Sequence, residues 1–280
     1  MLTILEIIKK TTDFFAAKGI DSPRLNAELL IGHALGLKRM ALYLQFERPL
    51  AETELEKIRP LVRRRSQREP LQYIMGETDF RGLMIKVDRR ALIPRPETEL
   101  LVEHAIAEAK EPATILDLGT GSGVIALSLA VAFPAAQVVA IDLSADALAL
   151  ARENAAKCAV AERVTFLQSH WFDAVPLDRP FDLIVSNPPY LTAEETAATT
   201  PEVRGYEPAR ALTAAEGGVA DLRTILQQAP RFLAEKGVLL VETGIAQHGE
   251  LKAIATNAGF SRCEGRQDLT GRDRYVLAWR

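Results

Sequence analysis

From Pro96 to the C-terminus, short runs of β-branched and other apolar residues alternate with longer segments of helical character. Parallel strands need crossover connections, which are usually helices, so this alternation predicts a doubly wound, mostly parallel α/β sheet with helices on both faces. Ligands of such sheets bind at the carboxyl ends of the strands. We therefore expect functional residues to follow the strands. The seven predicted strands are Thr114–Leu118, Gln137–Asp142, Arg163–Gln168, Phe181–Ser186, Gly237–Glu242, Gly259–Glu264 and Arg274–Trp279.

The chain before this sheet has a different pattern. We predict a small N-terminal helical domain over residues 1–69, a linker β-hairpin over 70–95 and the α/β domain over 96–280. Within the helical part, Pro23 begins a helix that Asp21 and Ser22 are expected to cap.

Arginines gather near the end of a further predicted helix, at Arg63, Arg64, Arg65 and Arg68. We expect them on an outer, solvated face, because a run of charges is usually exposed. An acidic or RNA partner that contacts them is the alternative.

The composition is that of an ordinary globular protein, with 280 residues, 48% hydrophobic, and a formal net charge of −3. A chain with this balance has no overall field that attracts the nucleic-acid backbone, so we expect no stable nucleic-acid binding. Cys158 and Cys263 stand alone, which fits a reducing cytoplasm. The apolar stretch Val124–Ile141 is divided by Pro134, which indicates a buried helix, a turn and a strand rather than a membrane span.

A glycine-rich loop follows the first predicted strand, at Gly119-Thr120-Gly121-Ser122-Gly123. Glycines there let the backbone approach a ligand closely. The dinucleotide fingerprint needs its third glycine at position 124, where this chain has Val124, so a pyrophosphate cofactor is disfavoured. The tighter spacing suits S-adenosylmethionine, which has no phosphates. A tight strand-to-helix turn without a ligand is the alternative.

Asp142 ends the second predicted strand, about twenty residues beyond the glycine loop. An acidic side chain at this place accepts hydrogen bonds from the ribose hydroxyls of an adenosine group. Capping of the next helix is a second interpretation, and both can hold at once.

The segment Asn187-Pro188-Pro189-Tyr190 follows the fourth predicted strand. The lone pair of an amide or aromatic amine is delocalised, so such a nitrogen must be gripped rather than deprotonated. The Asn187 side-chain oxygen and the Pro188 carbonyl can each accept one N–H, which orients the nitrogen and stabilises positive charge as it attacks. The Tyr190 ring offers a face for a flat group. The segment predicts methyl transfer to a planar amino nitrogen, against the alternative of a simple Pro-Pro turn.

Two further residue types carry less information. Trp171 follows the third predicted strand and either flanks an adenine ring or belongs to the core. The histidines His33, His104 and His248 lack metal-ligand spacing, so no metal site is expected.

Taken together, these motifs resemble those of the HemK/PrmC family, the glutamine methyltransferases of bacterial peptide-chain release factors. The resemblance runs nearly end to end. Besides the glycine loop and the Asn-Pro-Pro-Tyr segment, it includes residues 22–25, 68–74, 93–99, 206–208 and 268–274. The chain departs from the family at His170, where Asp is common, and at Ala214-Ala215-Glu216-Gly217-Gly218.

The resemblance implies a seven-stranded Rossmann-like class I methyltransferase sheet and the cofactor S-adenosyl-L-methionine. It implies methylation of the glutamine amide in the Gly-Gly-Gln loop of release factors, with the helical domain docking that protein substrate. The implied catalytic residues are Asn187, Pro188 and Tyr190, and the substrate lies against Asn187, Pro188, Pro189 and Tyr190. The implied cofactor contacts are Gly119, Thr120, Gly121, Ser122, Gly123, Asp142, Trp171 and Asn187.

Three alternatives remain at this point. A sister branch methylates a ribosomal protein, although residues 94–98 look like the release-factor branch. A nucleic-acid amino methyltransferase uses the same kind of pocket but usually brings a basic recognition surface. A binding module that has lost catalysis keeps the fold without the reaction.

Overall fold

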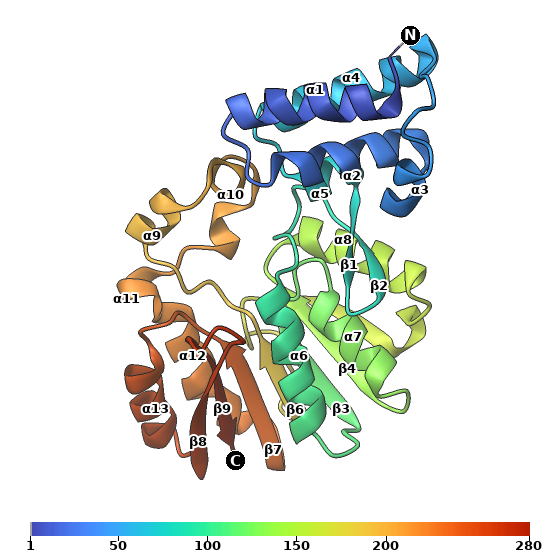
Figure 1. The fold of residues 1–280 in the computed structure, drawn as a ribbon. Helices are drawn as coiled ribbons and strands as arrows, with labels where there is room; N and C mark the ends of the chain where they lie inside the picture. The colour runs from blue at the N-terminus through green and yellow to red at the C-terminus, as the bar shows by residue number, and fades with distance from the viewer. Residues whose placement is uncertain (1) are drawn as a thin grey trace. The chain divides into compact units, whose positions relative to one another are not determined.

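The computed structural model describes residues 2–280, which divide into two compact units (Figure 1). The helical unit comprises the chain up to Gly76 together with Thr200–Tyr206. The α/β unit comprises Glu77–Thr199 and Glu207–Arg280. Among the described residues, no helix is long and apolar enough to cross a membrane.

The helical unit packs its helices around one apolar core, which includes Ile4, Phe15, Leu30, Ile31 and Leu42. Its helices are α1 (Ile4–Ala17), α2 (Pro23–Leu35), α3 (Arg39–Tyr43), α4 (Glu52–Ser66), α5 (Leu71–Met75) and α10 (Pro201–Tyr206). α2 begins at Pro23, as predicted, and ends at Gly36, whose φ of +66° suits glycine.

The predicted cap of α2 is wrong. Ser22 adopts a φ of 46° and makes no side-chain capping bond. The Asn26 amide instead donates to the carbonyls of Asp21 and Ser22. A side chain from the first turn therefore organises the entry to this helix, which a cap rule applied to Asp21 and Ser22 does not anticipate.

Arg65 is also placed differently from the prediction of an outward-facing cluster. Its side chain is buried, and its Nε donates to Asn26 Oδ1 at 2.8 Å while its Nη2 donates to Glu202 Oε1 at 2.9 Å. Arg68 is partly buried and donates to the other oxygen of Glu202 at 2.9 Å. Arg63 is exposed, as predicted. The periodicity of α4 cannot reveal Glu202, because this partner comes from a distant part of the chain.

The α/β unit contains the predicted sheet, with strand order β5-β4-β3-β6-β7-β9-β8. Neighbouring strands from β5 to β7 are parallel, and β9 pairs antiparallel with both β7 and β8. The strands are β3 (Thr114–Leu118), β4 (Gln137–Asp142), β5 (Val164–Gln168), β6 (Phe181–Ser186), β7 (Leu233–Glu242), β8 (Arg262–Gln267) and β9 (Asp273–Trp279). β7 begins four residues earlier than predicted, and β8 begins three residues later.

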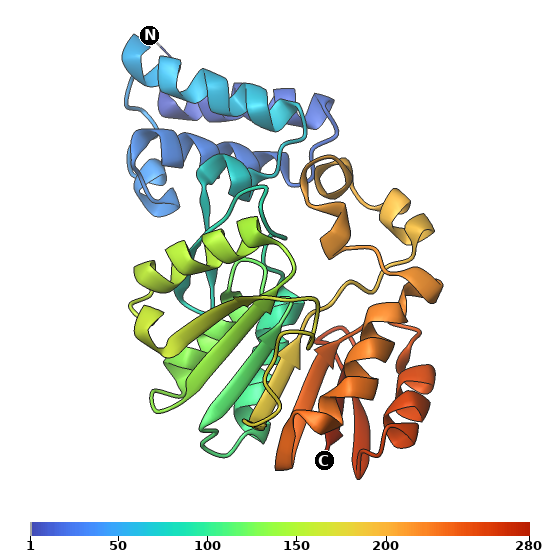
Figure 2. The ribbon, with the colours of Figure 1, turned by 180° about the vertical axis from the view of Figure 1, so that it is seen from behind.

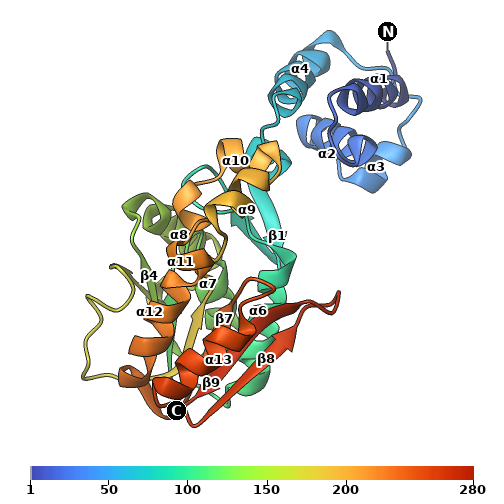
Figure 3. The ribbon, with the colours of Figure 1, turned by 90° about the vertical axis from the view of Figure 1, so that its left-hand side faces the viewer.

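Helices cover both faces of this sheet, which is why its strands are nearly continuous apolar runs (Figure 2). On one face lie α6 (Pro96–Glu108), α7 (Val124–Ala132) and α8 (Ala145–Lys157). On the other face lie α12 (Ala220–Gln228) and α13 (His248–Asn257), which Figure 3 shows beside β9. The apolar stretch Val124–Ile141 forms α7, a turn and β4, as predicted.

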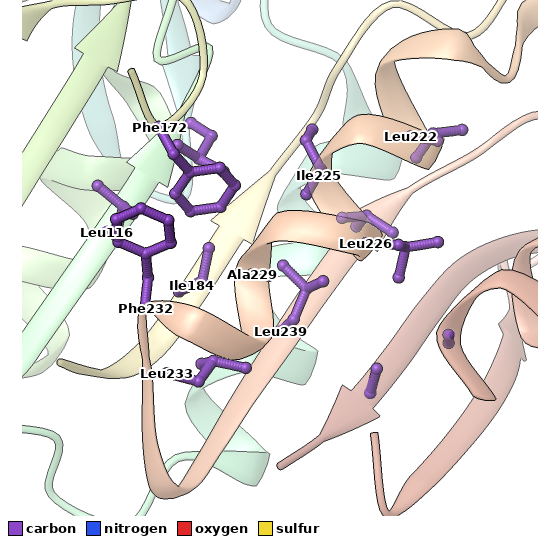
Figure 4. Packing of buried hydrophobic residues seen from close by; sticks show 14 of the residues in the cluster. Leu116, Phe172, Ile184, Leu222, Ile225, Leu226, Ala229, Phe232, Leu233 and Leu239 are labelled. Carbon is purple, nitrogen blue, oxygen red and sulfur yellow. The ribbon is translucent and has the colours of Figure 1, made fainter. Parts of the chain in front are cut away.

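The core beneath α12 and α13 joins alternate residues of the central strands to the helices (Figure 4). Leu116 and Leu239 face this core, while their neighbours on the strands point to the α6 side. The rings of Phe172 and Phe232 stack with centroids 4.5 Å apart. Such packing on both faces fixes the positions at which the strands end.

Short elements complete the α/β unit. A hairpin of β1 (Glu77–Phe80) and β2 (Leu83–Lys86) turns at Arg81 and Gly82, which both have positive φ. The connection after β6 contains α9 (Ala193–Ala198) and α11 (Ala215–Gly218). Single 3-10 turns occupy Ala161–Arg163, Ala209–Ala211 and Ala229–Arg231.

Candidate active site

A pocket of about 270 Å³ opens at the carboxyl ends of β3, β4 and β6, and every residue that lines it belongs to the α/β unit. It brings together most of the residues singled out in the sequence. Those that line it are Gly119, Thr120, Gly121, Ser122, Asp142, Trp171, Asn187 and Pro189. Gly123, Pro188 and Tyr190 lie next to these residues in the chain but do not line the pocket.

The glycine loop depends on backbone conformations that only glycine adopts readily. Gly119, Gly121 and Gly123 have φ values of +72°, +56° and +90°. A Cβ at Gly123 would also press against Ala151 of α8, at 3.2 Å. The first two glycines thus shape the pocket wall, while the third lets α7 begin close against α8.

Two buried polar side chains hold this loop in place. Asp117 Oδ2 accepts hydrogen bonds from the Thr120 hydroxyl at 2.6 Å and from the Ala126 amide at 3.1 Å. Asn154 of α8 donates to the carbonyl of Ser122 at 2.9 Å. The loop is therefore fixed from both sides before any ligand binds.

Asp117 lies in the strand that precedes the glycine loop, and no role was predicted for it. Its side chain is fully buried, and Oδ1 is a buried atom without a hydrogen-bond partner among the described residues. Burial raises the pKa of Asp117 to about 7. Its unpaired oxygen leaves one acceptor next to the glycine loop.

Asp142 faces the pocket with two backbone donors already in place. Its Oδ2 accepts from the Gly121 amide at 2.9 Å, and its Oδ1 accepts from the Ser144 amide at 2.8 Å. The cap of α8 is Ser144, whose side chain accepts from the Ala147 amide. Burial raises the pKa of Asp142, and the Arg210 charge acts in the opposite direction. Each carboxylate oxygen keeps a lone pair for a ligand in the pocket.

Trp171 lines the pocket beside the glycine loop. Its Nε1 donates to Asp221 Oδ1 at 3.1 Å, and its ring lies 3.5 Å from the place that a Cβ of Gly119 would occupy. Its φ of 45° is unusual for a tryptophan. The ring is partly buried and also packs against the core, which agrees with the core interpretation, while the contact with an adenine ring stays a prediction.

Asn187 begins the loop that follows β6. Its Nδ2 donates to the Thr98 hydroxyl at 2.9 Å, while no described residue donates to its Oδ1. The next residue, Pro188, is buried, and Pro189 lines the pocket. The Asn187 side chain is thus held at its nitrogen, with its oxygen left to act as an acceptor.

Tyr190 is fixed at several points. Its hydroxyl donates to Glu242 Oε1 at 2.9 Å, and its carbonyl accepts from Gln247 Nε2 at 3.0 Å. The Arg274 guanidinium lies over the ring, 5.7 Å from its centroid. Burial raises the pKa of Tyr190 well above its usual range. A Cβ at Gly218 would collide with the Tyr190 carbonyl oxygen, which explains a glycine there.

Sequence reasoning missed two residues behind this loop, Thr98 and Glu242. Both are buried, and the Thr98 hydroxyl donates to Glu242 Oε2 at 2.8 Å. The available signal was the position of Glu242, which ends the apolar strand β7 as Asp142 ends β4. Thr98 belongs to the family motif at residues 93–99, but no role was predicted for it.

Glu207 joins two motifs that are far apart in the sequence. Its Oε2 accepts from the Ile93 amide at 3.0 Å, and its Oε1 accepts from Arg95 at 2.6 Å. Ile93 and Arg95 both line the pocket. The Glu207 side chain is almost fully buried, so it holds the segment before α6 against the pocket.

A sheet of this order, with a glycine loop after β3 and an acidic residue at the end of β4, defines an S-adenosylmethionine-dependent methyltransferase. Residues 109–271 match the methyltransferase domain family. A methyltransferase from Pyrococcus furiosus has the same fold, with a TM-score of 0.54, 19% identity, and coverage of 71% of this chain and 89% of that one. The Thermus thermophilus 16S rRNA N2 G1207 methyltransferase, solved with AdoMet and guanosine, gives a TM-score of 0.53 at 17% identity, over 73% and 49% of the two chains.

Relatives that align over nearly the whole chain show to which family of methyltransferases it belongs. Residues 6–76 match the PrmC N-terminal domain family. The release factor glutamine methyltransferase of Chlorobaculum tepidum is 45% identical, over 97% of this chain and 95% of its own. That of Geobacter sulfurreducens is 43% identical, over 98% and 95%. The chain belongs to the family of release factor glutamine methyltransferases.

Proposed function

We propose that this pocket transfers a methyl group to the side-chain amide nitrogen of the glutamine in the Gly-Gly-Gln loop of peptide-chain release factors. The family to which the chain belongs makes it an S-adenosylmethionine-dependent protein-glutamine methyltransferase. The Asn187 side chain carries the proposal for the site, because its nitrogen is bonded to Thr98 and its oxygen is left as an acceptor.

The pocket fits S-adenosylmethionine, which supplies the electrophilic methyl group when bound. Asp142 presents a carboxylate with spare lone pairs, suited to two ribose hydroxyls. Gly119 and Gly121 have no side chains and so leave the pocket wall bare, and Trp171 offers an aromatic face beside it. We assign the cofactor contacts to these residues.

We assign the grip on the substrate to Asn187 and Pro188. The side-chain oxygen of Asn187 and the carbonyl of Pro188 accept the two N–H groups of the glutamine amide. This holds the nitrogen in line with the methyl group and stabilises its growing positive charge. With S-adenosylmethionine bound, the nitrogen would form the new N–C bond as the bond between the sulfonium and the methyl group breaks, which would leave S-adenosylhomocysteine, and one proton of the nitrogen would then pass to water. No general base is needed, because a methylated amide nitrogen is strongly acidic until it loses that proton.

Tyr190 and Pro189 shape the rest of the substrate site in this proposal. Because Tyr190 is held by Glu242 and by Gln247, its ring stays in one place as the amide enters. Pro189 has no N–H that would compete for the two acceptors. A rigid loop of this kind lowers the entropic cost of orienting the amide.

The release factor is the proposed partner, and the helical unit is the proposed docking element, since residues 6–76 match a domain specific to this family. Release factors act in translation, so we place the reaction in the cytoplasm. The acidic balance of the chain gives no support to a stable complex with nucleic acid.

The test is transfer of labelled methyl from S-adenosylmethionine to three acceptors: an unmodified release factor, the same factor with its loop glutamine changed to alanine, and DNA. Label on the unmodified factor alone supports the proposal. Equal label on both forms of the factor, or label on DNA, overturns the proposed substrate atom while the methyltransferase chemistry stands.

A further inference from the structure

The buried carboxylate of Glu242 is connected to Asn187, the proposed substrate-binding residue, through the side chain of Thr98. Glu242 is 1% exposed and accepts from the Thr98 hydroxyl at 2.8 Å and from the Tyr190 hydroxyl at 2.9 Å. Burial raises the pKa of Glu242, whereas the hydrogen bonds from Thr98 and Tyr190 and the positive charge of Arg274, which lies over the Tyr190 ring, act in the opposite direction and favour the carboxylate. Both oxygens of Glu242 therefore act as acceptors for hydroxyl donors.

The single hydrogen of the Thr98 hydroxyl decides the next bond. Because that hydrogen is donated to Glu242, the hydroxyl oxygen can only accept from Asn187. Asn187 meets it with Nδ2, at 2.9 Å. The amide oxygen of Asn187 then lies on the side away from Thr98, as the gripping role requires.

We propose that Glu242 is a positioning residue that fixes the orientation of the Asn187 side-chain amide through Thr98. This inference rests on the proposed function, because it explains why the Asn187 oxygen, rather than its nitrogen, meets the substrate. A donor at the Glu242 position would let Thr98 turn its hydrogen toward Asn187. The amide would then rotate and present N–H to the N–H groups of the glutamine, which repels them.

The first test removes the relay hydroxyl. Thr98→Val keeps the shape of the side chain but has no hydroxyl, while Thr98→Ser keeps the hydroxyl. We expect Thr98→Val to lower kcat on the release factor by about 10- to 100-fold, because a preorganised acceptor is no longer aligned. The Kd of S-adenosylmethionine should stay within about threefold, since the Thr98 hydroxyl is engaged by Glu242 and Asn187, and valine keeps the shape of the side chain where Thr98 lines the pocket. Thr98→Ser should keep kcat within about threefold.

Tyr275→Phe is the matched control for loss of a buried hydroxyl. Its hydroxyl donates to the Glu97 carbonyl at 2.8 Å and takes no part in the relay. This variant should keep kcat within about threefold. Equal losses of kcat in Tyr275→Phe and Thr98→Val would show that any buried hydroxyl in this region matters, and would overturn the relay.

The second test reverses the polarity of the relay. Asn187→Asp places an acceptor where Thr98 has no hydrogen to give, so kcat should collapse. Adding Glu242→Gln supplies an amide donor to Thr98, which frees the Thr98 hydrogen for the new carboxylate at position 187. We expect the double variant to regain at least about tenfold in kcat over Asn187→Asp. Glu242→Gln in the Asn187→Ala background should give no such rescue, because alanine offers no acceptor.

The two proposals fail in different ways. If the unaltered protein does not label the release factor, the proposed function fails. If the unaltered protein labels it and Asn187→Ala does not, but Thr98→Val is fully active, only the positioning role of Glu242 is overturned. Absence of rescue in a double variant that melts at the same temperature as Asn187→Asp overturns it as well.

Discussion

Arg65 Nη2 donates to Glu202 Oε1 at 2.9 Å, although the two residues are 137 positions apart in the chain. The same arginine also donates to Asn26 of α2. One buried guanidinium therefore joins three segments of the helical unit.

Loss of this guanidinium should destabilise the protein. We expect Arg65→Ala to lower the free energy of unfolding by about 1–3 kcal/mol, because the partly buried Glu202 and the Asn26 oxygen lose a charged donor. Arg63→Ala removes an exposed arginine of the same helix and should change it by less than about 0.5 kcal/mol. Urea denaturation followed by circular dichroism measures both. Equal effects would mean that Arg65 contributes no more than a surface charge.

Asn187→Ala should separate catalysis from cofactor binding. We expect turnover on the release factor to fall by about two to three orders of magnitude, as is typical for loss of one preorganised polar contact. Calorimetry should find S-adenosylmethionine binding largely retained. Asn257→Ala, at an exposed position of α13, serves as the control and should behave like the unaltered protein. Near-normal turnover of Asn187→Ala would refute the gripping model.

Asp142→Ala should weaken cofactor binding. The ribose hydroxyls lose a charged acceptor worth about 1.5–3 kcal/mol, which corresponds to a rise in Kd of about 10- to 150-fold. Asp142→Asn keeps one acceptor oxygen and should lose less. Isothermal titration calorimetry gives both constants. An unchanged Kd in Asp142→Ala would mean that this residue serves only the amides of Gly121 and Ser144.

Asp117 should make stability depend on pH. Its pKa is about 7 in the folded protein against an ordinary 3.8, so the folded state binds this proton more tightly than the unfolded state does. Its contribution to the free energy of unfolding therefore falls as the pH rises from about 4 to about 7, by up to about 4 kcal/mol. Asp117→Asn has no proton to lose.

The measurement for Asp117 is urea denaturation of both forms, without cofactor, at pH 5 and at pH 8. From pH 5 to pH 8, the free energy of unfolding of Asp117→Asn should rise relative to that of the unaltered protein. A difference in stability that is the same at both pH values would contradict the prediction.

The sequence predicted best what depends on neighbouring residues. Gln137–Asp142 and Phe181–Ser186 are strands with the predicted bounds, because their apolar runs and flanking turns are local signals. β8 was misplaced by three residues, since its partly exposed residues give a weak strand pattern. The bulged end of its pairing with β9 adds residues that no alternation reveals.

The candidate site divides in the same way. Asn187 and Asp142 could be chosen from the sequence because Asn187 follows a predicted strand and Asp142 ends one. Thr98 and Glu242 could not, since their importance lies in contacts over 89 and 52 residues to Asn187 and Tyr190. The role of Glu207 likewise could not be predicted, because it depends on a hydrogen bond from Ile93, 114 residues earlier.

The assignment of Thr200–Tyr206 to the helical unit means that the chain passes between the two units three times, after Gly76, Thr199 and Tyr206. Tyr206 donates to the carbonyl of Gln67, and Glu202 holds Arg65 and Arg68, so this short segment completes the fold of the N-terminal helices. The helical unit consequently cannot be replaced by exchanging one continuous segment of the sequence. A chimera that takes its N-terminal helices from a relative has to take the matching segment as well, because otherwise Arg65, Arg68 and Gln67 lose their partners in it.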